Sequence, residues 1–214
     1  MGKDIGLYHG KMGLILFFAH YYEHTGIQVY KDTADELMDE VIAEIHTELP
    51  FGFAFGLSGI GWGVEYLIQN GFESDDSLDI CEEIDKKIME KDPRRMTDYS
   101  LDSGLEGILH YVLAHIKGVL SQHNITPFDD SYLAELYQAV TTVKESVKLS
   151  EDFKRLSAIY ITFYEDRKTL DYDLTLSSII GNVTIVNDDL NCFPLGLKDG
   201  MGGYLLKPLI TESE

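Results

Sequence analysis

The sequence predicts an all-α protein that forms an incomplete α/α toroid, with inner and outer helices alternating in about four to five hairpins. Two observations lead to this fold class. A glycine-led segment recurs at a regular spacing, and each segment is followed by an apolar and then an amphipathic helical pattern. We therefore expect one domain over residues 1–214, with an irregular segment at 169–195 where the helical pattern is lost.

The repeat is visible in four segments, which share a polar residue followed by two glycines near the start of an apolar run. They are His9-Gly10-Lys-Met-Gly13, Ser58-Gly59-Ile-Gly-Trp62-Gly63, Ser103-Gly104-Leu-Glu-Gly107 and Asp199-Gly200-Met-Gly-Gly203. The first glycines, Gly10, Gly59, Gly104 and Gly200, repeat every 48 residues or so, with one unit skipped before the last. A fifth unit without glycines is therefore expected near residue 152, where Ser150 precedes a helical pattern over Arg155 to Phe163.

Each unit contains two kinds of predicted helix. The first helix is apolar almost all round and is expected to be buried on most sides: Leu14 to Tyr22, Val64 to Ile68 and Ile108 to Ile116. The second is apolar on one side only, over Ala34 to Ile45, Leu78 to Ile88 and Leu133 to Val147, including Ile42 and Val143. Gly26 and Gly71 stand where helix C-caps are expected.

Charge and hydropathy exclude several classes of partner. The formal net charge is −20, which argues against binding nucleic acid or an anionic membrane surface but permits a basic peptide, a cation or a neutral ligand. The longest apolar run, Met12 to Ala19, is too short to span a membrane and lacks the features of a signal peptide. We expect a cytoplasmic protein without a membrane or nucleic-acid partner.

The repeated helix starts are the candidate site. Ser58, Ser103 and Asp199 are residue types that cap helix N-termini, and capping alone explains them. If the inner helices are parallel, however, their N-termini converge on one mouth. That mouth would gather five candidate ligand-binding residues: His9, Ser58, Trp62, Ser103 and Asp199. Trp62 is then the candidate platform for a ligand.

The glycine motifs resemble the lanthionine synthetase C-like family. The resemblance rests on Gly6-Leu-Tyr-His9-Gly10-Lys-Met-Gly13, Gly56-Leu-Ser-Gly59-Ile-Gly-Trp62-Gly63, Gly104-Leu-Glu-Gly107 and Gly196-Leu-Lys-Asp-Gly200-Met-Gly-Gly203. It implies an α/α barrel and a role in peptide modification, with a precursor peptide as partner. In active members it also implies a zinc ion that activates a cysteine thiol for addition to a dehydrated Ser or Thr.

The zinc ligands of active members do not match this sequence. Those members carry a cysteine in a Trp-Cys-Tyr-Gly-like motif and a Cys-His pair before a repeat glycine. Here Trp62 is followed by Gly63, and the residue before His9 is Tyr8. Cys81 lies on the apolar side of a predicted outer helix, and Cys192 lies a few residues before the last repeat but has no His neighbour. We therefore expect no metal and no cofactor, and an accessory or non-catalytic peptide-binding role rather than a zinc-dependent cyclase.

Other interpretations remain open. Paired carboxylates across a toroid cavity are typical of glycosidases, and Glu65, Glu106 and Asp102 are the candidate catalytic residues for a carbohydrate-active enzyme. Asp98 forms a pair with Asp102 at the expected mouth of the third unit. An interaction scaffold without a small-molecule site is a further alternative. Toroids of the resembled family close with six or seven units, so a shorter ring would leave apolar edges open. Those edges predict either a homodimer or an irregular cap formed by Thr169 to Leu195.

Overall fold

The computed structural model describes residues 4–143, 148–168, 170–180 and 195–211, and all regular secondary structure in these ranges is helical. The helices are α1 (Lys11–Thr25), α2 (Gln28–Glu44), α3 (Leu57–Gln69), α4 (Ser77–Met89), the 3₁₀-helix η1 (Pro93–Arg95), α5 (Leu105–His123), α6 (Asp130–Thr141), α7 (Glu151–Asp166), α8 (Ser177–Ile180) and α9 (Met201–Thr211). Two compact units are distinguished: Met1–Ile45 with Leu174–Glu214, and His46–Asp173. The prediction of a single domain stays a prediction.

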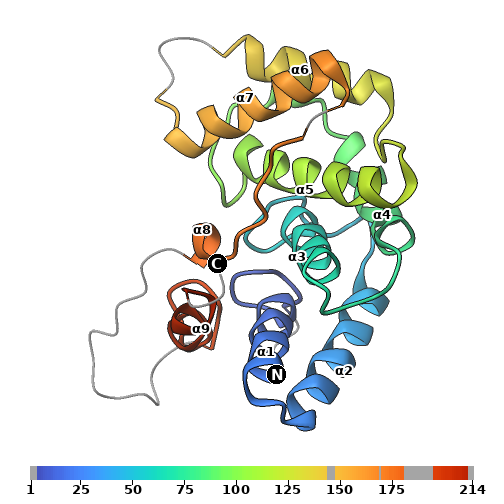
Figure 1. Cartoon of the computed structure of the whole chain (residues 1–214). Helices are drawn as coiled ribbons and strands as arrows, with labels where there is room; N and C mark the ends of the chain where they lie inside the picture. The colour runs from blue at the N-terminus through green and yellow to red at the C-terminus, as the bar shows by residue number, and fades with distance from the viewer. Residues whose placement is uncertain (1–3, 144–147, 169, 181–194, 212–214) are drawn as a thin grey trace. The chain divides into compact units, whose positions relative to one another are not determined.

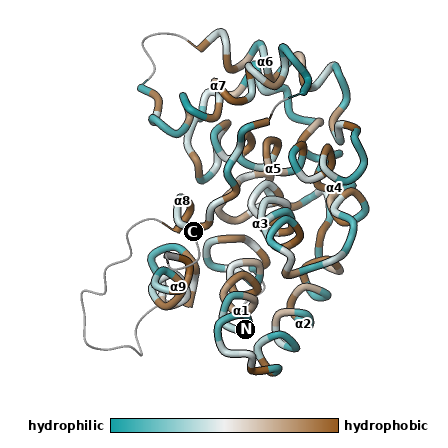
Figure 2. The backbone as a smooth tube through the Cα atoms, viewed as in Figure 1, coloured by the Kyte–Doolittle hydropathy of each residue, from teal (hydrophilic) through white to brown (hydrophobic). Residues whose placement is uncertain are grey.

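In the unit His46–Asp173, α5 lies between α3 and α7 (Figure 1). Both α3 and α5 are buried along most of their length, whereas α4, α6 and α7 each bury one side. Hydrophilic and hydrophobic stretches alternate along α7 in Figure 2, as a half-buried helix requires. This alternation of buried and half-buried helices is that of an α/α toroid.

The other unit contains the α1–α2 hairpin and the short C-terminal helices. In it, α1 packs against α2 and α9, and α9 also contacts α8. Gly26 ends α1 in the left-handed conformation with φ of 68°, which favours glycine. Lys11 at the start of α1 bonds Glu44 and Glu40 of α2, which ties the inner helix to the outer one.

The predicted helices are confirmed, including the fifth unit. The inner helices correspond to α1, α3 and α5, the outer ones to α2, α4 and α6, and α7 follows Ser150 as its N-cap. Two details were wrong. Ile42 is 39% exposed rather than part of the buried stripe, and α6 ends at Thr141, before Val143. Val147 lies outside the described residues.

Part of the predicted irregular segment 169–195 can be compared with the structure. Residues 170–176 have no helix or strand, and α8 follows. Residues 169 and 181–194 lie outside the described ranges. No helix in the described part of the chain combines the length and the apolar composition that a membrane span needs.

Candidate functional site

The inner helices begin in the same way, with a glycine N-cap and a backbone clamp. Gly10, Gly56 and Gly104 are the N-caps of α1, α3 and α5, all in extended conformation. Backbone N–H groups in the first turn donate to carbonyls seven residues earlier: Lys11 to Asp4, Met12 to Ile5, Leu57 to Pro50, Ser58 to Phe51, Leu105 to Asp98, Gly202 to Leu195 and Gly203 to Gly196. A Cβ atom at the N-cap would collide with this loop, since at Gly104 it would lie 2.5 Å from the Ser100 nitrogen. The repeat thus encodes a close approach between a loop and a helix start.

This geometry corrects the predicted register and the predicted caps. Gly56, not Gly59, is equivalent to Gly10 and Gly104, so the second repeat is three residues out of step in the sequence alignment. Ser58 and Ser103 therefore are not the N-caps of their helices. Loop carbonyls already accept hydrogen bonds from these first-turn N–H groups. The same N–H groups are therefore not available to bind an anion.

Two of the predicted ligand-binding residues are core residues. Ser58 is fully buried, and its hydroxyl donates to the Phe51 carbonyl. Trp62 is also fully buried, and its indole Nε1 donates to the Tyr172 hydroxyl at 2.9 Å. The prediction that Trp62 presents a platform to a ligand was therefore wrong, because both side chains stabilise the interior of their unit.

The other three predicted ligand-binding residues are exposed at helix starts. Ser103 lies in the unit His46–Asp173, whereas His9 and Asp199 lie in the other unit. Ser103 donates to the Asp98 carboxylate at 2.7 Å, next to the start of α5. Asp199 has a φ of 55° and directly precedes Gly200. Of the five predicted residues, Ser103 is the one that adjoins a pocket described below.

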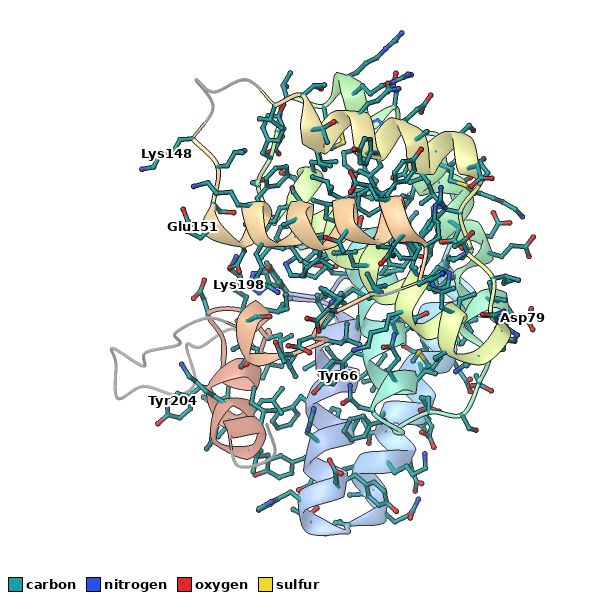
Figure 3. The ribbon with its side chains drawn as sticks, turned by 45° about the horizontal axis from the view of Figure 1, so that its top comes forward. Tyr66, Asp79, Lys148, Glu151, Lys198 and Tyr204 are labelled. Atoms are coloured by element: carbon teal, nitrogen blue, oxygen red, sulfur yellow. The ribbon has the colours of Figure 1, made fainter. Side chains whose placement is uncertain are left out.

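An open pocket of about 560 Å³ lies at the starts of α5 and α7. Seven of its eight lining residues have polar side chains, and both signs of charge are among them: Thr97, Asp98, Tyr99, Ser100, Leu101, Glu106, Lys148 and Ser150. Figure 3 shows Lys148 and Glu151 projecting outward where the chain enters α7. We call this pocket the Glu106 pocket. It contains one of the predicted catalytic residues and adjoins another, Asp102.

The charged groups of the Glu106 pocket are held by hydroxyl and backbone donors. The Ser150 hydroxyl donates to the Glu106 carboxylate and also accepts from the Phe153 N–H as the α7 N-cap. Burial raises the pKa of Glu106, and the Ser150 hydrogen bond opposes part of that shift. The Ser100 N–H and the hydroxyls of Ser103 and Ser100 lower the pKa of Asp98, which favours its ionised form. The pocket thus holds an ionised carboxylate and, in Glu106, a carboxyl group that takes up a proton more readily than usual.

Glu65 belongs to a buried cluster instead of a cavity. His115 Nδ1 lies 2.6 Å from Glu65 Oε1, and His115 Nε2 lies 3.0 Å from Asp85 Oδ2. The Tyr111 hydroxyl donates to Asp85 at 2.5 Å, and Gln69 donates to Glu65 at 2.6 Å. Burial lowers the pKa of His115, but the hydrogen bonds and charges of Asp85 and Glu65 outweigh it and raise this pKa to about 9. At neutral pH an imidazolium bridges two carboxylates.

This cluster joins α3, α4 and α5, and the sequence interpretation missed it. Glu65 is fully buried, so the predicted pairing of Glu65 with Glu106 across a ligand cavity was wrong. A signal was present, because Glu65 and His115 both interrupt apolar inner helices. Buried ionisable groups need partners, so either residue alone indicates that a group of opposite charge lies beside it in the core.

The model for lanthionine synthetase C-like proteins matches residues 3–159, nearly three quarters of the chain. The chain belongs to this family. The match confirms the resemblance seen in the glycine motifs, and it covers α1 through most of α7 together with the whole Glu106 pocket. No curated protein and no solved structure matches the chain.

The zinc ion of active lanthionine synthetase C-like enzymes does not fit the described residues of this member. Cys81 is fully buried in α4, where burial and the charges of Asp85 and Glu65 raise the pKa of its thiol well above normal. A cysteine binds zinc as its thiolate, so this environment disfavours zinc binding by Cys81. Within 4–143, 148–168, 170–180 and 195–211, no three His, Cys, Asp or Glu side chains gather as metal ligands. Cys192 lies outside these ranges.

Proposed function

We propose that this lanthionine synthetase C-like protein binds a peptide in the Glu106 pocket and serves a peptide-modification pathway without zinc-thiolate chemistry of its own. The observation that carries the proposal is the open pocket at the starts of α5 and α7, with polar side chains of both charge signs. Family membership supports a peptide as the ligand class.

The chemistry of the pocket favours peptides with a basic group. The backbone N–H of Leu105 in the first turn of α5 already bonds the loop, so recognition falls to side chains. Asp98 and Glu106 offer carboxylate oxygens, while the serine hydroxyls and Tyr99 complete a polar surface. A lysine side chain or a peptide amino terminus is the complementary partner for such carboxylates.

Fluorescence anisotropy with the full chain tests this proposal. The probe is the fluorescein-labelled peptide Gly-Lys-Ser-Thr-Cys-Gly, which carries one basic group and the side chains that the family's chemistry uses. Glu106→Gln removes the charge but retains an oxygen for Ser150, and we expect it to weaken binding at least about fivefold. Glu36→Gln, an exposed acid of α2, is the matched control and should bind as wild type.

Equal binding by Glu106→Gln and Glu36→Gln would contradict the proposed site. Absence of binding by the wild-type chain would contradict the peptide-binding role for this class of peptide.

A carbohydrate-active role is the second candidate, because Asp98 and Glu106 line one pocket. The raised pKa of Glu106 is typical of a general acid, whereas the lowered pKa of Asp98 suits a base or nucleophile. Release of p-nitrophenol from p-nitrophenyl glycosides tests this role. Hydrolysis that is lost in Glu106→Gln and kept in Glu36→Gln would favour it over peptide binding.

A further inference from the structure

A second pocket adjoins the Glu106 pocket in the same unit. It has a volume of about 370 Å³ and is lined by Pro93, Arg94, Arg95, Met96, Thr97, Tyr99, Ala139 and Thr142. Thr97 and Tyr99 line both pockets, so the two hollows flank one short stretch of the loop between η1 and α5. We call this second hollow the arginine pocket.

The arginine pocket carries a cation that is able to bind another group. Arg94 is held by Asp92 at 2.8 Å and by Glu135 at 2.9 Å. Arg95 contacts Asp92 through Nε at 3.2 Å, and its side chain is 86% exposed. This exposure leaves the guanidinium group accessible from solvent. Arginine therefore retains donors here that suit a carboxylate.

A negative charge, opposite to that of Arg95, lies three residues further along the loop at Asp98. Asp98 and Glu106 supply two carboxyl groups to the Glu106 pocket, against one ammonium group from Lys148 in its lining. Asp98 is held in its ionised form by Ser100 and Ser103. Three residues of chain separate the Cα atoms of Arg95 and Asp98 by at most about 11 Å. A bound extended peptide advances about 3.3 Å per residue, so matching charges would stand up to about three residues apart.

We infer that the two pockets form one polarised groove, which selects an extended peptide segment with a basic and an acidic side chain about three residues apart. The basic group faces Asp98 and Glu106, and the acidic group faces Arg95. Tyr99 lies between the two ends and is fixed by an edge-on contact with Phe153, with ring centroids 5.5 Å apart. This inference rests on the proposed peptide-binding function and adds the charge pattern of the ligand.

Three labelled peptides test the charge pattern by fluorescence anisotropy with the full chain. They are Gly-Lys-Ser-Thr-Glu-Gly, Gly-Lys-Ser-Thr-Lys-Gly and Gly-Gln-Ser-Thr-Gln-Gly, each with fluorescein at the same end. We expect the Lys/Glu peptide to bind about fivefold more tightly than the other two at low salt, and this preference to shrink at high salt.

The charge reversal Arg95→Glu is the decisive variant. It should reverse the preference, so that the Lys/Lys peptide binds more tightly than the Lys/Glu peptide. A gain of affinity for one ligand cannot result from misfolding. Lys86→Glu makes the same change of charge on the exposed side of α4 and should keep the wild-type order.

The outcomes separate this inference from the proposed function. If Arg95→Glu keeps the wild-type order while Glu106→Gln still weakens binding, the polarised groove is wrong and the peptide site stands. Equal wild-type affinity for the three peptides also overturns the groove. If none of them binds, both proposals fail.

Discussion

His115→Gln should lower the stability of the chain by an amount that depends on pH. Asp85 and Glu65 outweigh the effect of burial and raise the pKa of His115 from its ordinary value of 6.5 to about 9 in the folded state. A shift of this size corresponds to about 3 kcal/mol of stability. Because the folded pKa is raised, this stability is fully present below pH 6.5 and is lost as the pH rises through 9. The variant should therefore be about 3 kcal/mol less stable than wild type near neutral pH, and the difference should shrink toward zero at alkaline pH.

Urea unfolding followed by circular dichroism measures this difference at a series of pH values. His46→Gln makes the same substitution at an exposed histidine of the same unit and should stay within about 0.5 kcal/mol of wild type. Titration of the His115 imidazole by NMR gives its pKa directly. A difference between the two variants that does not change with pH, or a His115 pKa below its ordinary value, would refute the buried imidazolium.

Three further predictions concern the helix starts, the core and the metal. Gly104→Ala should destabilise the chain by about 2 kcal/mol or more, because the added Cβ meets backbone atoms of the preceding loop; an unchanged melting temperature would contradict the clamp. Trp62→Phe should cost about 1–3 kcal/mol by removing one of the two hydrogen-bond partners of the Tyr172 hydroxyl, since His110 remains, and by leaving a gap in the core. The single tryptophan of the wild-type chain should resist acrylamide quenching until the protein unfolds. Metal analysis of the purified protein should find no stoichiometric zinc, and zinc that is lost in Cys192→Ala would overturn the proposed metal-free role.

The position of the candidate site at a helix start could be predicted from the sequence, but the full set of residues that line it could not. The third helix start was predicted, and with it Glu106, Asp102 and Ser103, because glycine spacing is a local signal. Asp98 was also expected at this helix start. The loop that supplies Tyr99 folds back on the start of α5, and no sequence period marks such a contact. The glycine repeat also gives no signal at Arg94 and Arg95, since their position beside Thr97 depends on how η1 packs against α6.

The second helix start shows why the repeat was found correctly while its alignment in this unit was wrong by three residues. Gly56 and Gly59 both precede an apolar run, so either one fits the pattern of the other units. The backbone resolves the choice, because only a residue without a side chain fits where a Cβ at position 56 would lie 2.2 Å from the Pro50 carbonyl oxygen. Ser58 and Trp62 consequently face the core, so neither belongs to the predicted mouth.

By itself the sequence determined the number and order of the main helices, their inner and outer character and the family. These properties follow from hydrophobic periodicity and from glycines, which act over one or two helical turns. Only the tertiary structure decided which polar groups meet. His115 pairs with carboxylates 50 and 30 residues away, and Glu106 with a hydroxyl 44 residues away. Such pairs form because buried charge needs a partner, and the partner is chosen by packing rather than by sequence distance.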